Sequence, residues 1–141
     1  FSKEEFNIVS MFDVIEHLDQ PGYVLDEIKR ILHPEGQLIV NYPEYDSWPR
    51  KLMGVKWPFF LSVHLFYFTP KSIKRILEKH GFIVIRIEPY YQTLELGYVL
   101  ERAGQIFYLV KWLEKAVKTL GLGQIPFTYY LGQTLVTAKK A

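Results

Sequence analysis

The chain has 141 residues, of which 49% are hydrophobic and 16% aromatic, enough apolar material for one buried core. Its formal net charge of +2 is small for this length, so bulk electrostatics do not indicate a nucleic-acid partner. Cysteine is absent, which excludes disulfides and thiolate metal sites and agrees with a cytoplasmic location, and no uncharged apolar run is long enough to predict a membrane span.

The N-terminal part of the sequence predicts a strand, a helix and a second strand. Residues 6–11, FNIVSM, form an apolar run typical of a strand that is buried on both faces. We expect Asp19 to cap a helix whose apolar residues recur at helical spacing from Val24 to Leu32. The sequence HPEG ends this helix, and residues 37–42, QLIVNY, predict the next strand. The short links favour a parallel pair with a right-handed crossover.

Residues 43–68 are predicted to be irregular and are rich in Pro, Trp, Phe and Tyr. A long aromatic loop after a parallel strand is often part of a binding site. Thr69 then predicts a helix cap with Pro70 in the first turn, Gly81 ends this helix, and residues 82–87 predict a third strand. This alternation of strands and helices predicts an α/β protein.

Residues 94–120 predict a long helix or a helix pair with an apolar stripe wider than a normal core face, and residues 127–140 predict a final strand. We therefore expect a sheet core formed by residues 1–93 and 125–141, with a helical insertion or cap at 94–124. The stripe favours two roles, either a cap that covers the acceptor pocket or a homodimer face. Its lysines and aromatic residues leave peripheral membrane contact open as an alternative.

Two stretches together resemble a known family. The sequence FNIVSMFDVIEHLDQPGYVLDEIKRILHPEGQLIVNYPEY, followed later by HLFYFTPKSIKRILEKHGFIVIRI, is similar to the second half of a class I S-adenosylmethionine-dependent methyltransferase. The likeness covers about residues 6–88 and follows the family's order of motifs. Asn7 departs from the aspartate that is usual there, and Glu35 and Gln37 flank Gly36 where the family usually carries a second glycine.

The resemblance implies the C-terminal half of a doubly wound, Rossmann-like sheet, since the family's glycine-rich loop and ribose-binding acid have no counterpart in this sequence. The tripeptide GLG at 121–123 follows a helix rather than a strand, so it lacks the context of a phosphate-binding or cofactor-binding loop. We expect residues 1–141 alone to bind S-adenosylmethionine weakly or not at all and to be inactive. The alternative is a non-catalytic half-domain that serves oligomerisation or protein interaction.

The resemblance also implies cofactor contacts. The strand at 6–11 would end beside the switch in strand order, where ligands of open α/β sheets bind. Met11, Phe12 and Asp13 are accordingly expected to bind S-adenosylmethionine. Core packing is an equal alternative for Met11, whereas the cofactor contact is favoured for Phe12.

Asp13, Glu16 and His17 lie within five positions, and their pattern has three interpretations. The first is structural, with acidic groups near a helix N-terminus and a histidine bonded to the next loop. The second is general-base catalysis by His17 on a hydroxyl acceptor. The third, and least favoured, is a divalent metal bound by carboxylate and imidazole groups, because quinone-biosynthesis O-methyltransferases carry a similar acidic-x-x-E-H stretch. We therefore assign no residue as a metal ligand.

His64 is a second base candidate, with a loop-anchoring role as the alternative. The expected reaction is methyl transfer to a small-molecule acceptor, with a hydroxyl on an apolar or lipid-like substrate slightly favoured. A set of aromatic residues could line such an acceptor or simply pack the loop: Tyr42, Tyr45, Trp48, Trp57, Phe59 and Phe60.

Overall fold

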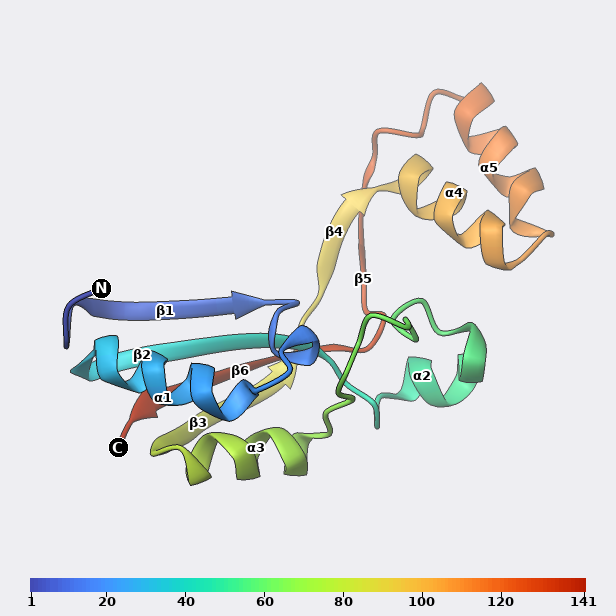
Figure 1. Cartoon of the computed structure of the whole chain (residues 1–141). Coiled ribbons are helices and arrows are strands. Elements are labelled where there is room, and N and C mark those ends of the chain that lie inside the picture. Colours follow the sequence, from blue (N-terminus) through green and yellow to red (C-terminus); the bar gives the residue numbers. More distant parts are fainter. The chain divides into compact units, whose positions relative to one another are not determined.

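A computed structural model describes residues 1–105 and 107–141 in full and the backbone of Ile106. The chain folds as two compact units. The first consists of Phe1–Tyr90 and Leu131–Ala141, and the second of Tyr91–Tyr130 (Figure 1).

The first unit is built on a four-stranded sheet in the order β1 (Phe6–Phe12), β2 (Leu32–Pro43), β6 (Gln133–Lys140) and β3 (Phe82–Pro89). Strands β1 and β2 are parallel, as the sequence predicts, whereas β6 runs antiparallel to both of its neighbours. Strand β1 therefore lies at one edge of the sheet, with β2 as its neighbour.

Two helices cover one face of this sheet. Helix α1 (Pro21–Ile31) connects β1 to β2, and α3 (Pro70–Lys79) precedes β3. Both helices place apolar side chains against the same side of the strands, which is the burial that drives such a layer together. The buried core that results contains Met11, Ile15, Leu25, Ile28, Leu32, Leu38, Val40, Tyr42, Phe68, Ile73, Leu77, Phe82, Val136 and Ala138.

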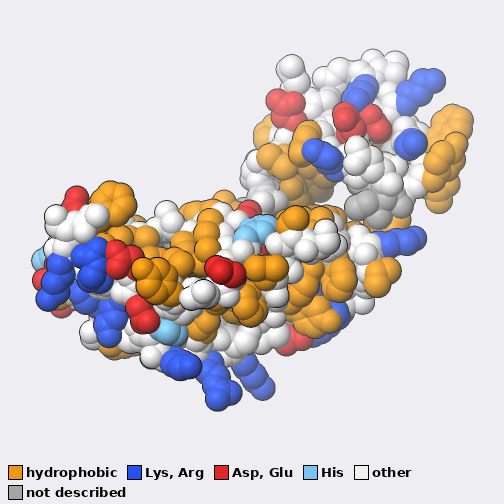
Figure 2. All heavy atoms as spheres, in the orientation of Figure 1, with side chains coloured by type: hydrophobic (Ala, Val, Ile, Leu, Met, Phe, Trp, Pro, Cys, Tyr) orange, Lys and Arg blue, Asp and Glu red, His pale blue; other side chains and the backbone are white. Residues whose placement is uncertain are grey.

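The opposite face carries apolar side chains that remain exposed. Ile8 is 59% exposed, and Ile83 and Ile85 on β3 are also exposed. Figure 2 shows hydrophobic side chains spread widely over the visible surface. The prediction that strand 6–11 is buried on both faces is therefore wrong for this chain, because α1 and α3 cover one face of an edge strand and leave the other open.

The two predicted helix caps have different outcomes. The prediction for Asp19 is wrong, since α1 begins at Pro21 after Gln20, and the Asp19 carboxylate instead accepts a hydrogen bond from the Gln20 amide at 2.9 Å. The prediction for Thr69 is confirmed. Its hydroxyl accepts from the Ser72 amide at 3.2 Å, and the Ser72 hydroxyl accepts from the Thr69 amide at 2.8 Å, which completes a capping box.

The segment predicted to be irregular, 43–68, contains two short helices. Helix α2 spans Trp48–Met53, and a 3-10 turn, η2, spans Gly54–Lys56. The segment is fixed to the rest of the unit by Trp57, which is buried and donates a hydrogen bond from its indole nitrogen to the Leu131 carbonyl at 2.8 Å.

The second unit pairs β4 (Gln92–Glu95) with β5 (Pro126–Tyr129) in an antiparallel ribbon. Between these strands lie α4 (Leu96–Ile106) and α5 (Val110–Thr119), so the predicted helical region is a helix pair. The single final strand expected at 127–140 is wrong. The chain turns at Gly132, whose φ of +96° is favourable for glycine, and this turn separates β5 from β6.

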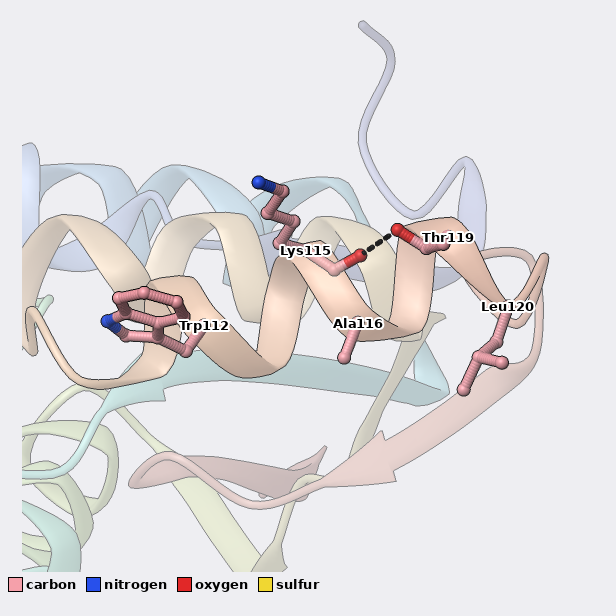
Figure 3. A pocket seen from close by; sticks show the side chains of 5 residues that line it. All are labelled: Trp112, Lys115, Ala116, Thr119 and Leu120. Carbon is pink, nitrogen blue, oxygen red and sulfur yellow. Dashed lines mark hydrogen bonds between the residues drawn. The ribbon is translucent and has the colours of Figure 1, made fainter.

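Helix α5 has an exposed outer surface with an open hollow (Figure 3). The Thr119 hydroxyl donates to the Lys115 carbonyl at 2.8 Å, and Trp112 and Leu120 are largely exposed. The residues that line the hollow are Trp112, Lys115, Ala116, Thr119 and Leu120. Within the described part of the chain, none of the helices has the length and apolar character needed to cross a membrane.

The capping box gives a prediction about stability. Replacing Thr69→Ala removes the side-chain acceptor of the Ser72 amide, so we expect a loss of about 1 kcal/mol in the free energy of unfolding, or roughly 3–4 °C in melting temperature. Lys71→Ala, an exposed change in the same first turn, is the matched control for thermal unfolding by circular dichroism. Equal melting temperatures for the two variants would show that the cap does not stabilise α3.

Candidate functional site

The polar residues after β1 do not all point the same way. Asp13 has a φ of +51°, and its amide donates to the Asn41 carbonyl at 3.3 Å. Its carboxylate accepts a hydrogen bond from the Gln133 side-chain amide on β6 at 2.6 Å. Burial raises the pKa of the Asp13 carboxyl group, and the Gln133 hydrogen bond together with His64 and His17 offsets part of this effect. Asp13 is thus held by the sheet.

Glu16 lies in the 3-10 turn η1 (Ile15–His17) and is only 1% exposed. Its backbone carbonyl accepts hydrogen bonds from the amides of Leu65 at 2.8 Å and Phe66 at 3.2 Å. Neither carboxylate oxygen has a hydrogen-bonding partner among the described residues. Burial raises the pKa of this carboxyl group, because the charged form loses its hydration. The nearby amide of its own backbone offsets part of this rise in pKa, while Asp13 adds to it and His17 opposes it.

His17 is exposed and oriented by the same loop. Its Nδ1 lies 3.0 Å from the Val63 carbonyl oxygen. Because a carbonyl can only accept, Nδ1 carries the hydrogen in this contact. In the neutral imidazole, Nε2 is then left with a free lone pair, which can accept a proton or bind a metal ion.

His64 lies beside His17, although 46 residues lie between them in the sequence. The two ring centroids are 4.6 Å apart, with an angle of 75° between the ring planes. His64 is buried, and its Nδ1 has no hydrogen-bonding partner in the described structure. Burial lowers the pKa of His64, and His17 lowers it further, while a backbone hydrogen bond at Phe59 opposes both.

Three of these side chains converge. One ligand atom each from Glu16, His17 and His64 can be chosen so that all three lie within 4.8 Å of one another. The sequence singled out all three residues, but it grouped Glu16 and His17 with Asp13. No local signal could show that the loop carrying His64 folds back onto η1.

The predicted cofactor residues lie at the end of β1 with different surroundings. Met11 is 5% exposed and belongs to the hydrophobic core, so packing accounts for it. The ring of Phe12 is 47% exposed and contacts Tyr90 edge-on, with 5.9 Å between the ring centroids. Sequence reasoning missed Gln133, the partner of Asp13, because it lies 120 positions away and carries no motif.

Comparison with known proteins identifies the class. The topology is that of a class I S-adenosylmethionine-dependent methyltransferase fold. A family model described as a methyltransferase domain matches residues 1–87. The chain therefore belongs to this methyltransferase-domain family. A search of curated proteins finds no match.

Several solved structures share the fold. A SAM-dependent methyltransferase from Thermotoga maritima is 19% identical, with a TM-score of 0.60, and the match covers 99% of this chain and 58% of that one. A SAM-dependent methyltransferase from Archaeoglobus fulgidus is 16% identical, with a TM-score of 0.59 and coverages of 98% and 61%.

A third structure carries ligands. It is the 1,6-didemethyltoxoflavin-N1-methyltransferase of Burkholderia thailandensis, with its named substrate and S-adenosylhomocysteine bound. It is 16% identical, with a TM-score of 0.56, and the match covers 100% of this chain and 46% of that one. The present chain thus spans roughly half of the structures it matches, and at these identities the likeness concerns the fold.

The unpaired carboxylate leads to a prediction about pH and stability. The folded state raises the pKa of Glu16 above its ordinary value of 4.5, so folding favours the protonated form and stability from this group falls as pH rises past that value. With a chelator present, Glu16→Gln should therefore raise the free energy of unfolding at pH 8 by about 1 kcal/mol, with little gain near pH 4.

Urea unfolding at the two pH values measures this difference. Glu35→Gln is the matched control, because Glu35 is exposed and the same charge is removed. The contrary result is a Glu16→Gln protein that is less stable than the parent at pH 8 with the chelator present. It would mean that the buried Glu16 carboxylate is stabilised by a partner.

Proposed function

We propose that this chain forms the acceptor-side half of a methyltransferase that transfers a methyl group from S-adenosylmethionine to a small molecule. The observation that carries this proposal is the pair of imidazoles, His17 and His64, beside the carboxyl end of β1. In open α/β sheets this end of the strands is where ligands bind. The Burkholderia relative, which binds S-adenosylhomocysteine and a small-molecule substrate, supports the same class of reaction.

Met11, Phe12 and Asp13 are the residues proposed to meet the cofactor. The half-exposed ring of Phe12 offers an apolar surface against which a planar adenine can stack. The Asp13 carboxylate, fixed by Gln133, can accept a hydrogen bond from an amino group of the cofactor. Met11 belongs to the buried core, so it would support Phe12 and Asp13 from below and make little direct contact with the cofactor.

The sulfonium of S-adenosylmethionine supplies an already activated methyl group, so the protein chiefly aligns the acceptor and receives its proton. We propose that an acceptor hydroxyl lies against His17, whose Nε2 takes the proton as the oxygen bonds to the methyl carbon and the carbon–sulfur bond breaks. The hydrogen bond from His17 Nδ1 to the Val63 carbonyl would hold the ring in the tautomer this requires.

The remaining cofactor contacts would come from sequence outside residues 1–141. The methyltransferase structures from Thermotoga maritima and Archaeoglobus fulgidus extend well beyond the part that this chain matches. A glycine-rich loop and a ribose-binding acid in that additional part would complete the cofactor site. This is why residues 1–141 alone are proposed to be inactive.

The second unit suggests roles outside the chemistry. The exposed apolar residues Trp112 and Leu120 both line the open hollow beside α5, and Leu109, just before this helix, is also exposed. We propose that the region 94–124 acts as a cap or as a homodimer face. Lys111 and Lys115 keep an anionic membrane surface as the alternative partner. A non-catalytic half-domain using this surface is the rival to the enzyme.

Titration with S-adenosylmethionine tests the enzyme proposal. For the intact natural protein that contains residues 1–141, calorimetry should give a saturable binding heat, whereas residues 1–141 alone should give a much weaker one or none. An absence of heat from the intact protein at millimolar cofactor would favour the non-catalytic alternative.

Phe12→Ala in the intact protein should weaken cofactor affinity several-fold, because it removes the stacking surface. The change does not remove a buried core residue, since the Phe12 ring is half-exposed. Tyr23→Ala, an exposed aromatic change on α1, is the matched control. Unchanged affinity in a folded Phe12→Ala protein would remove Phe12 from the cofactor site.

His17→Ala should lower turnover about 100-fold or more while leaving cofactor affinity nearly unchanged, as expected for loss of a general base. His33→Ala, at an exposed histidine, is the control. Measured turnover equal to that of the parent would return His17 to a purely structural role.

A further inference from the structure

We propose that Glu16, His17 and His64 form a binding site for a divalent transition-metal ion, with Zn²⁺ as the best match. This inference goes beyond the proposed methyl transfer and rests on the burial, the missing hydrogen-bonding partners and the geometry of the three side chains. It differs from the metal interpretation of the sequence, in which Asp13 completes the set. Asp13 is bonded to Gln133, and His64 takes its place beside Glu16 and His17.

The first observation is that two of the three groups are buried and contain atoms that have no hydrogen-bonding partner among the described residues. Glu16 is 1% exposed and His64 is 9% exposed. Both carboxylate oxygens of Glu16 and Nδ1 of His64 have no hydrogen-bonding partner among the described residues. A buried polar atom without a partner costs about 1–3 kcal/mol, and a charged one costs more, so proteins rarely retain such groups side by side. A cation would give a partner to one Glu16 carboxylate oxygen and to His64 at the same time.

The second observation is the orientation of His17. Metal-binding histidines commonly donate their other ring N–H to a carboxylate or a backbone carbonyl, which fixes the tautomer and the plane of the ring. His17 makes this contact through Nδ1 to the Val63 carbonyl at 3.0 Å. Its Nε2 is therefore the nitrogen available as a ligand.

The third observation is the spacing. The three ligand atoms lie within 4.8 Å of one another. A tetrahedral zinc ion with bonds of about 2.0–2.1 Å holds its ligand atoms roughly 3.4 Å apart. Side-chain rotation can close this difference, since η1 and the loop are already joined by the hydrogen bonds of Leu65 and Phe66 to the Glu16 carbonyl.

The donor set selects the ion. Two imidazole nitrogens and one carboxylate oxygen suit Zn²⁺ and its neighbours in the transition series, whereas Mg²⁺ prefers oxygen ligands and retains several waters. Three protein ligands leave one position of a tetrahedral ion open. A water molecule or an oxygen of the methyl acceptor can occupy that position, and the ion would lower the pKa of a bound hydroxyl group.

The role proposed for His17 depends on whether the ion is bound. Without the ion, His17 Nε2 receives the proton of the acceptor. With an ion bound, His17 and His64 would both hold it, and the ion would supply the activation of a hydroxyl group that His17 otherwise provides as a base. Metal binding and methyl transfer can therefore fail separately, and each is measured separately.

The test uses the intact protein after treatment with a chelator and dialysis. Titration with Zn²⁺ in a calorimeter should give one site per chain, and Co²⁺ should give the visible absorption of a four-coordinate ion. Glu16→Gln and His64→Gln should each weaken Zn²⁺ binding at least tenfold. Circular dichroism verifies that each variant is folded. The Co²⁺ spectrum is recorded on the parent protein, so this measurement does not depend on the folding of any variant.

Two controls separate this site from its alternatives. Asp13→Asn should retain the Zn²⁺ affinity of the parent, because its carboxylate bonds to Gln133 and lies outside the ligand set. His33→Gln should also retain it, since that histidine is exposed elsewhere. Both results support the proposed three ligands.

Three results would overturn the site. They are an absence of Zn²⁺ binding and of a Co²⁺ spectrum in the parent protein, parent-like affinity in folded Glu16→Gln and His64→Gln proteins, and a loss of binding in Asp13→Asn equal to that in Glu16→Gln. A parent protein that binds S-adenosylmethionine but no Zn²⁺ would remove the metal site and leave the methyltransferase proposal standing.

Discussion

The junction between η1 and the loop before α3 determines the rest of the candidate site. The Glu16 carbonyl accepts two amide hydrogen bonds from this loop, and the His17 ring donates a third to the Val63 carbonyl. These bonds join the end of β1 to a segment almost fifty residues later. They bring His64 against His17, and they bury the Glu16 side chain. Without them, the histidines would belong to two unrelated surface segments.

The sheet of the first unit explains why this junction lies at an open boundary. Helices α1 and α3 bury one face, while Ile8 and Ile83 on the other remain exposed. Strand β1 is the edge of the sheet, although a parallel strand is normally covered on both sides. Single exposed apolar residues are common, but Ile8, Ile83 and Ile85 are exposed apolar side chains on the two edge strands of the same face. This supports the proposal of a half-domain.

Much of the first unit could be predicted from the sequence because its signals are local. The β-branched run at 37–42, the cap at Thr69 and the turn at Gly81 each act through near neighbours, and the structure contains all three. Strand β2 nevertheless begins at Leu32, so the HPEG sequence, which predicts a break between helix and strand, belongs to the strand. Failures occurred where distant residues decide. The burial of Ile8 depends on what covers the sheet, and the orientation of Asp13 depends on Gln133, which carries no recognisable motif.

The candidate site was predictable in its residue types and not in its grouping. Their closeness in the sequence grouped Asp13, Glu16 and His17, but the chain turns at Asp13 with a positive φ before a short 3-10 turn begins. This turn sends the Asp13 carboxylate toward β6 and leaves Glu16 under the loop. A sequence that buries an unpaired carboxylate beside an unpaired imidazole contradicts its own folding preferences, and such local conflicts concentrate at functional sites. The proposed cation would give a partner to one Glu16 oxygen and to His64. These unpaired atoms are therefore the strongest physical argument for a metal ion at this site.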